Sequence, residues 1–179
     1  MNRTRQRALE AATTLVGAHG VRALTHGRVD TAAGLPPGST SNHFRTRAAL
    51  LAGVIEWIAT SERGDAGAPD IRSHDDLVGA LTRMIEVQSG PLAGRTRARY
   101  ALFLEADEAA ARPLREQRAG MEAWIRTILR ILGGDEAEAR APFLMATAEG
   151  ILLHRITIDP DAPIEESIAR AVDATLAQP

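Results

Sequence analysis

The sequence contains no cysteine and no lysine, and only six of its 179 residues are aromatic. Without cysteine the chain can form no disulfide, thiolate nucleophile, cysteine-type zinc finger or iron–sulfur cluster. It also has no run approaching the roughly 18 apolar residues that a membrane-spanning helix needs. Its basic start, MNRTRQRALEAATTL, runs into an amphipathic pattern instead of the apolar core of a signal peptide. These absences lead us to expect an intracellular, cytoplasmic protein that does not bind membranes.

Charge is distributed unevenly along the chain. With 45% hydrophobic and 25% charged residues and a net charge of −2, the composition is that of a globular protein with one or two compact domains. Residues 1–50, however, contain seven arginines and two acids, a charge of +5, whereas residues 51–179 contain 14 arginines and 21 acids, a charge of −7. A basic N-terminal segment on an acidic body favours a nucleic-acid backbone as the ligand of that segment.

The apolar residues recur with helical spacing almost throughout, and no alternating pattern is long enough to predict a strand. Gly20 and Gly34 are suited to end helices, and Thr25 and Ser73 are suited to cap the helices that follow them. We predict an all-α fold of about nine helices. The first ends at Gly20, and the others are expected over residues 25–33, 37–43, 46 to the loop at 64–69, 73–90, 92–107, 112–132, 136–157 and 164–177.

No constellation of residues predicts an enzyme. The five histidines, at positions 19, 26, 43, 74 and 154, lack metal-ligand spacing, and there is no phosphate-binding glycine loop after a strand and no GxSxG motif. The carboxylate pairs Asp75-Asp76 and Glu165-Glu166 begin helices, where negative charge complements the helix dipole. We therefore expect no catalytic activity, no cofactor and no metal.

Residues 25–47, THGRVDTAAGLPPGSTSNHFRTR, predict a helix, a tight turn at Gly34 and a second short helix. This is the pattern of a helix-turn-helix unit, which lays its second helix in the major groove of DNA. Spacing alone leaves other interpretations open, because short helix pairs are common in α-helical proteins.

The details of this segment resemble the TetR family of one-component transcriptional repressors. The resemblance covers residues 5–55 and rests on the amphipathic first helix ALEAATTLVGAHG and on Leu24-Thr25, Ala33-Gly34-Leu35, Gly38-Ser39, His43-Phe44, Thr46-Arg47 and Ala49-Leu50-Leu51. It implies a recognition helix over residues 37–43.

The resemblance also implies which side chains meet DNA. Asn42 can pair bidentately with an adenine, and Thr25, His43 and Arg47 match positions that usually contact phosphate. A packed, hydrogen-bonded role beside Phe44 is the alternative for His43. The residues that we expect to bind DNA are Thr25, Arg28, Pro37, Ser39, Ser41, Asn42, His43 and Arg47.

Three positions depart from the family pattern. Ser41 stands where a tyrosine is common, Asp30 where a small apolar residue packs against the recognition helix, and Thr40 where an apolar residue is usual. A buried Asp30 carboxylate needs a partner, either Arg28 or a backbone N–H. We expect an altered sequence preference rather than a loss of DNA binding.

Beyond this segment the resemblance is confined to helix count, length and apolar pattern. It implies a helix-turn-helix DNA-binding domain over residues 1–46 and an effector-binding and dimerisation domain over residues 47–179.

The last two predicted helices indicate a homodimer. Helices 136–157 and 164–177 carry more apolar surface than one partner covers, and Ala146, Ala148 and Gly150 permit close approach. A monomeric core built from the same helices is the alternative.

The family resemblance further implies a small effector bound between the helices of the body. The candidate residues are aromatic and polar side chains in otherwise apolar helices: Gln88, Tyr100, Phe103, Trp124, Thr147 and His154. With so few aromatic residues the cage would be mostly aliphatic, which predicts a hydrophobic ligand. Alternatively, Phe103 and Trp124 belong to the core and Thr147 bonds its own helix.

The sequence therefore predicts a DNA-binding transcription regulator, a repressor released from a pseudo-palindromic operator by a small hydrophobic effector. Two alternatives stay open. One is a helical interaction or ligand-binding protein that has lost specific DNA binding, and the other is a DNA-binding protein without an effector.

Overall fold

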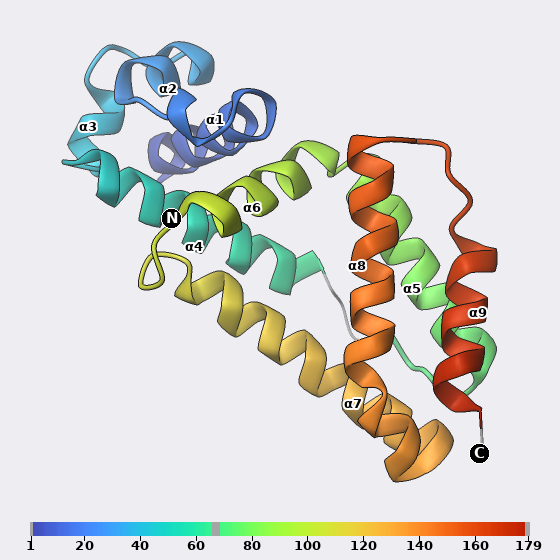
Figure 1. Ribbon diagram of the computed structural model, residues 1–179. Helices are drawn as coiled ribbons and strands as arrows, with labels where there is room; N and C mark the ends of the chain where they lie inside the picture. The colour runs from blue at the N-terminus through green and yellow to red at the C-terminus, as the bar shows by residue number, and fades with distance from the viewer. Residues whose placement is uncertain (1, 66–68, 178–179) are drawn as a thin grey trace. The chain divides into compact units, whose positions relative to one another are not determined.

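The computed structural model describes residues 2–65 and 69–177, and within these ranges the protein is α-helical and has no strand. The described chain forms nine α-helices, which confirms the predicted fold class (Figure 1). No described helix is long and apolar enough to cross a membrane. The elements are α1 (Arg3–His19), η1 (Val21–Ala23, a 3-10 helix), α2 (His26–Ala33), α3 (Ser39–His43), α4 (Arg47–Asp65), α5 (His74–Ser89), α6 (Ala93–Glu105), α7 (Arg112–Ala139), α8 (Ala141–Thr157) and α9 (Glu165–Leu176).

The helices form two compact units. The first contains Met1–Asp65 and Gly94–Gln117, and the second contains Ala66–Ala93 and Arg118–Pro179. The first unit thus includes α1 to α4, nearly all of α6 and the beginning of α7, whereas the second includes α5, the rest of α7, α8 and α9. These units are defined by contacts within the chain, so the predicted division of function at residues 46 and 47 stays a prediction.

Capping side chains set the helix ends in the first unit. Thr25 Oγ1 accepts a hydrogen bond from the N–H of Arg28 at 3.4 Å, as its sequence position predicts, and α2 ends at Gly34, which has a left-handed φ of 60°. Arg7 of α1 donates to the carbonyl oxygens of Ala33 at 2.6 Å and Gly34 at 3.3 Å. These bonds hold α1 against the end of α2.

The apolar core of the first unit is built from α1, α2, α4, α6 and the start of α7. Two glycines in this core permit close approach. A Cβ atom on Gly17 would lie 2.1 Å from the backbone oxygen of Gly94, and one on Gly53 would lie 2.5 Å from the ring of Phe44. The largest buried side chains of this core are Leu9, Leu24, Leu50, Ile55, Ile58, Leu102 and Leu114.

A buried ion pair joins α4 to α6 within the same unit. Both carboxylate oxygens of Glu62 lie 3.2 Å from Nη1 of Arg99, and the two residues are 5% and 8% exposed. Because an unpaired charge at this depth would be costly, each of these side chains depends on the other.

In the second unit α5, α8 and α9 lie side by side (Figure 1). Ser73 caps α5 by accepting the N–H of Asp76 at 3.1 Å, as its sequence position predicts. His74 Nε2 lies 2.8 Å from Oδ1 of Asp173 and so joins the start of α5 to α9. The contacting faces are apolar and bury Leu77, Leu81, Ile85, Leu144, Leu152, Ile168 and Val172.

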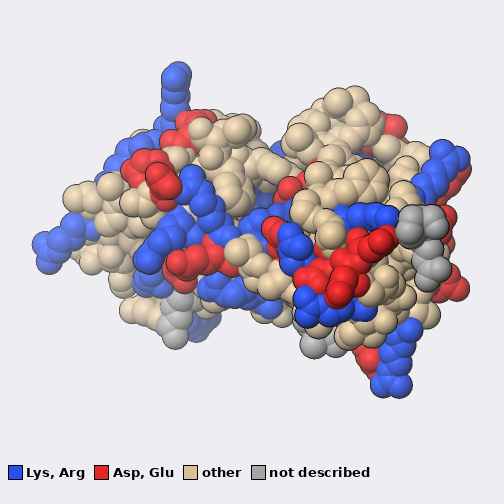
Figure 2. All heavy atoms as spheres, turned by 60° about the horizontal axis from the view of Figure 1, so that its bottom comes forward, with Lys and Arg blue, Asp and Glu red and all other residues tan. Residues whose placement is uncertain are grey.

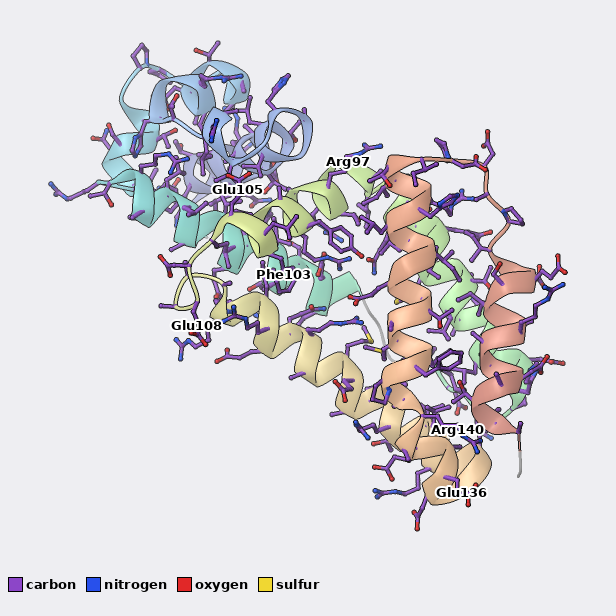
Figure 3. All side chains as sticks on the ribbon, in the orientation of Figure 1. Arg97, Phe103, Glu105, Glu108, Glu136 and Arg140 are labelled. Carbon is purple, nitrogen blue, oxygen red and sulfur yellow. The ribbon has the colours of Figure 1, made fainter. Side chains whose placement is uncertain are left out.

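Arg140 fixes the C-terminal end of α9. It lies beside that end in Figure 3, and its Nη1 donates to the carbonyl oxygens of Thr175 at 3.2 Å and Ala177 at 2.5 Å. A cation at a helix C-terminus complements the helix dipole, so this contact stabilises the last turn of α9.

One helix boundary in this region differs from the one that the sequence predicts. The break expected after residue 132 is present, because Gly134 has a non-helical φ of 75° and ψ of −166°, and a short helical segment follows it to Ala139, the last residue of α7. The helix expected over residues 136–157 begins only at Ala141, with Pro142 in its first turn. Glycine adopts a positive φ without strain, so the chain bends at Gly134 and then continues as a helix.

Candidate nucleic-acid interface

The second helix of the helix-turn-helix segment, α3, begins later than the sequence predicts. A start near Pro37 was expected because proline suits the first turn of a helix. In the structure Pro37 lies in a turn and α3 begins at Ser39, because Gly38 adopts a left-handed φ of 88°. A glycine is therefore required immediately before α3.

The side chain of Asp30 joins α2 to the first turn of α3. Oδ2 accepts the N–H of Gly38 at 2.8 Å, whereas Oδ1 accepts the N–H of Thr40 at 2.8 Å and the hydroxyl of Thr40 at 2.5 Å. Asp30 is 4% exposed and Thr40 is fully buried. Of the two kinds of partner considered for Asp30, the structure shows backbone N–H groups, and it adds the hydroxyl of Thr40.

These hydrogen bonds keep Asp30 ionised. Burial raises the pKa of the Asp30 carboxyl, but the hydroxyl and N–H of Thr40, the N–H of Gly38 and the nearby His26 together bring the pKa below its usual value. Because folding depresses this pKa, the charge contributes stability above the unfolded pKa of about 3.9. That contribution is lost as the pH falls through the folded pKa.

The residues expected to contact DNA come from three consecutive elements and the turn between two of them. Seven of the eight are exposed, and Ser39 is half-buried. They are Thr25 and Arg28 at the start of α2, Pro37 in the turn, Ser39, Ser41, Asn42 and His43 on α3, and Arg47 at the start of α4.

The side chains on α3 differ in their hydrogen bonds. Ser39 donates to the carbonyl oxygen of Pro36 at 2.6 Å, and Ser41 donates to that of Gly38 at 2.9 Å, so both hydroxyls bond to the preceding turn. Asn42 and His43 make no side-chain hydrogen bond within residues 2–65 and 69–177. Their polar atoms are exposed, and His43 is not packed into the core.

Arg47 has a structural contact that the sequence does not predict. Its Nε donates to the carbonyl oxygen of Leu24 at 3.2 Å, and its Nη2 donates to that of Val21 at 2.8 Å. Arg47 thus ties the start of α4 to the segment before α2, and its phosphate contact stays a prediction. Exposed Arg45 is absent from the predicted set, although a basic residue directly after the recognition helix could have indicated it.

The surface charge of the N-terminal segment is mostly positive. On the face shown in Figure 2, arginines and acidic side chains of the whole chain alternate rather than form one patch. Among residues 1–50, however, Asp30 is buried, which leaves Glu10 as the exposed acid against seven arginines. This segment can therefore attract phosphate.

The six residues expected to bind an effector are divided between the two compact units. Tyr100 and Phe103 lie on α6 in the first unit, and Phe103 is half-buried (Figure 3). The other four belong to the second unit and are Gln88 on α5, Trp124 on α7, and Thr147 and His154 on α8.

Two of these side chains have contacts that bear on the alternatives. Thr147 donates its hydroxyl to the carbonyl oxygen of Phe143 at 2.9 Å, which is the bond within its own helix considered above. The guanidinium of Arg99 lies 5.1 Å from the centre of the Tyr100 ring. The effector-binding role of the six residues stays a prediction.

A cavity of about 670 Å³ lies in the second unit, where α5 meets the connection from α8 to α9. None of the six candidate residues lines this cavity, and its wall combines charged side chains with apolar ones. The cavity is lined by Thr82, Glu86, Arg155, Glu165, Glu166, Ala169 and residues 161–164.

Within the described residues no group of three or more His, Asp or Glu side chains could hold a metal ion.

Residues 72–178 match the protein family described as tetracyclin repressor-like, C-terminal domain. The chain belongs to the TetR family. This match lies in the C-terminal body, whereas the motifs of the helix-turn-helix segment lie in residues 5–55, so two separate parts of the chain indicate the same family. Its fold is that of a ligand-responsive transcription regulator, a class that is generally not enzymatic.

Several similar solved structures cover nearly the whole chain. A family member from Streptomyces coelicolor A3 is 26% identical, with a TM-score of 0.74, over 99% of this chain and 100% of its own. The multidrug binding protein EbrR, complexed with ethidium, is 27% identical, with a TM-score of 0.66, over 97% of this chain and 98% of EbrR. A transcriptional regulator from Rhodococcus sp. Rha1 shares the fold with a TM-score of 0.75. It is 20% identical, over 96% of this chain and 93% of its own. No curated protein matches the sequence.

The contacts of Arg47 predict that two variants with the same charge change differ in stability. We expect Arg47→Ala to lower the free energy of unfolding by about 1 kcal/mol or more, because two backbone oxygens lose a charged donor. Arg28→Ala removes an exposed arginine of α2 and should change stability by less than about 0.5 kcal/mol. Urea unfolding followed by circular dichroism measures both, and equal stability of the two variants would show that Arg47 does not hold this segment.

Proposed function

We propose that this TetR-family chain is a one-component repressor. As a homodimer it binds a pseudo-palindromic operator in double-stranded DNA, and a small hydrophobic effector releases it. The observation that supports DNA binding most strongly is α3. Its exposed side chains Asn42 and His43 make no hydrogen bond within the described part of the chain, and its first turn is fixed by Asp30.

The proposed DNA contacts follow from the positions of the side chains. Asn42 reads a base edge, because an amide can pair bidentately with adenine in the major groove. Pro37, Ser39 and Ser41 lie beside it in the turn and on α3 and meet bases or phosphates. Phosphates are contacted by Thr25, Arg28, His43 and Arg47. In a dimer the two recognition helices lie about one DNA turn apart, roughly 34–36 Å.

The exposed face of α8 supports the proposed homodimer. Phe143 and Leu153 are 51% and 43% exposed, and exposed Ala146 and Gly150 lie between them on the same helix face. The opposite face of α8 is buried in its own unit. An apolar face with small central residues suits a second copy of the same helix, so we assign the interface to α8 and α9, within the predicted ranges 136–157 and 164–177.

The effector proposal draws on similar proteins. EbrR, 26–27% identical to this chain in its complexes with ethidium and proflavin, is named a multidrug binding protein. An effector releases DNA only if it binds one conformation of the protein more tightly than the other. We assign effector binding to the body, through Gln88, Tyr100, Phe103, Trp124, Thr147 and His154.

The DNA-binding proposal is tested by selecting a preferred site from random duplexes and comparing its affinity with that of scrambled DNA across a salt series. We expect a two-fold symmetric site and an affinity that falls steeply with salt. Asn42→Ala should reduce the ratio of specific to scrambled affinity about tenfold. Arg28→Ala should weaken both affinities equally and lower the salt slope by about one per protomer. Sequence-independent binding by the wild type would instead favour a helical protein that has lost specific DNA binding.

The dimer is tested by arginine substitutions at two open glycines. A Cβ on Gly150 would meet no atom within 4 Å, so Gly150→Arg leaves the protomer intact but introduces a large charge into the proposed interface. Gly120 of α7 is equally open, so Gly120→Arg is the matched control. Light scattering should give twice 19.2 kDa for the wild type and the control but 19.2 kDa for Gly150→Arg. A dimeric Gly150→Arg variant would contradict this interface.

The effector site is tested with the two tryptophans of the chain, Trp57 and Trp124. In Trp57→Phe the one remaining tryptophan is Trp124, and we expect saturable quenching of its fluorescence by a hydrophobic aromatic cation such as malachite green, with release of DNA at the same dye concentrations. Trp124→Phe retains Trp57 and is the control for non-specific quenching. Dye binding that quenches both variants equally, or that leaves DNA bound, would contradict the proposed site.

A further inference from the structure

Asp30 and Thr40, two of the three departures from the TetR-family pattern, are in contact. The Thr40 hydroxyl donates to Oδ1 of Asp30 at 2.5 Å, and both residues are buried. A hydroxyl at position 40 would lack this acceptor if position 30 carried an apolar side chain. The two departures are therefore one feature, in which a polar contact replaces an apolar one beneath the recognition helix.

The same carboxylate also accepts the N–H groups of Gly38 and Thr40, each at 2.8 Å. The N–H groups at the start of a helix have no partner within the helix. Here two of them are occupied by a side chain from α2.

We propose that Asp30 is the positioning residue of the recognition helix, which fixes the first turn of α3 for base reading. This inference rests on the proposed DNA-binding function. The charge of Asp30 repels phosphate while its hydrogen bonds orient α3, so Asp30 lowers the affinity for DNA of any sequence and raises the discrimination between sequences.

Glu10 provides a matched control for the charge. It is the other acidic residue among residues 1–50, it is exposed on α1, and its Oε1 accepts a hydrogen bond from Gln6 at 2.9 Å. Glu10→Gln and Asp30→Asn therefore make the same charge change in the same part of the chain, but only Asp30→Asn affects the start of α3.

The test compares the affinities of both variants for the selected site and for scrambled DNA. In Asp30→Asn we expect tighter binding to scrambled DNA and a specific-to-scrambled ratio reduced about tenfold or more, as the loss of hydrogen bonds to a charged group implies. Glu10→Gln should keep this ratio within about twofold of the wild type. Equal ratios in the two variants would overturn the proposal.

A double variant separates positioning from a general loss of stability. Asp30→Ala leaves the buried Thr40 hydroxyl without its acceptor, and adding Thr40→Val removes that hydroxyl. We expect Asp30→Ala/Thr40→Val to have a higher specific-to-scrambled affinity ratio than Asp30→Ala alone. Equal ratios in the single and the double variant would contradict the coupling of the two residues.

Amide hydrogen exchange provides a measurement that does not depend on DNA. In Asp30→Asn the amides of Gly38 and Thr40 should exchange about tenfold faster or more, while those in the middle of α1 stay protected. Unchanged exchange at Gly38 and Thr40 would overturn the positioning role even if the wild type discriminates between sequences. A wild type that does not discriminate would refute the proposed function itself, and the DNA role of Asp30 with it.

Discussion

The carboxylate of Asp30 accepts two backbone N–H groups and one hydroxyl from the start of α3, and these three bonds fix the first turn of the helix that we propose for DNA recognition. The helix has five residues, too few to persist through its own backbone hydrogen bonds. Its order therefore comes from its surroundings, above all from Gly38 before it and the carboxylate beneath it. Hydrogen bonds to an ionised acceptor are stronger than those to a neutral one, and unlike an apolar contact they fix a direction.

Two arginines hold the elements on either side of this helix. Arg7 bonds to the carbonyl oxygens at the end of α2, and Arg47 bonds to those before α2. Among the seven arginines that make residues 1–50 basic, these two therefore also act as structural donors to the backbone. In this segment arginine therefore has two roles. It supplies positive charge that can attract phosphate, and it donates hydrogen bonds that hold the helices together. The number of arginines in the segment is for that reason larger than the number available only for DNA.

The features predicted correctly from the sequence are those that neighbouring residues determine. Thr25 and Ser73 cap the helices expected of them, and Gly34 ends α2, because a cap acts within about four residues of its own position. The start near Pro37 was wrong because the helix preference of proline was weighed without the turn that Gly38 requires. The glycine pair Gly133-Gly134 interrupts the helical backbone where the sequence predicts it, but the second interruption, at Arg140 before α8, was not predicted.

Features that need contacts between distant elements could not be predicted to the same degree. The partners of Asp30 lie on another helix, and Arg47 bonds to residues more than 20 positions away, for which helical periodicity gives no signal. The effector candidates were selected by residue type within apolar helices, and the structure divides them between two compact units. The family match to the body therefore supports ligand response in general but does not specify the ligand-binding side chains.

The most direct test of the central claim is a crystal structure of the dimer on its selected operator. The account predicts α3 in the major groove, with the Asn42 amide on a base edge and Asp30 still bonded to Gly38 and Thr40. A structure in which Asp30 has turned away from the start of α3, or in which α3 lies outside the groove, would contradict the account.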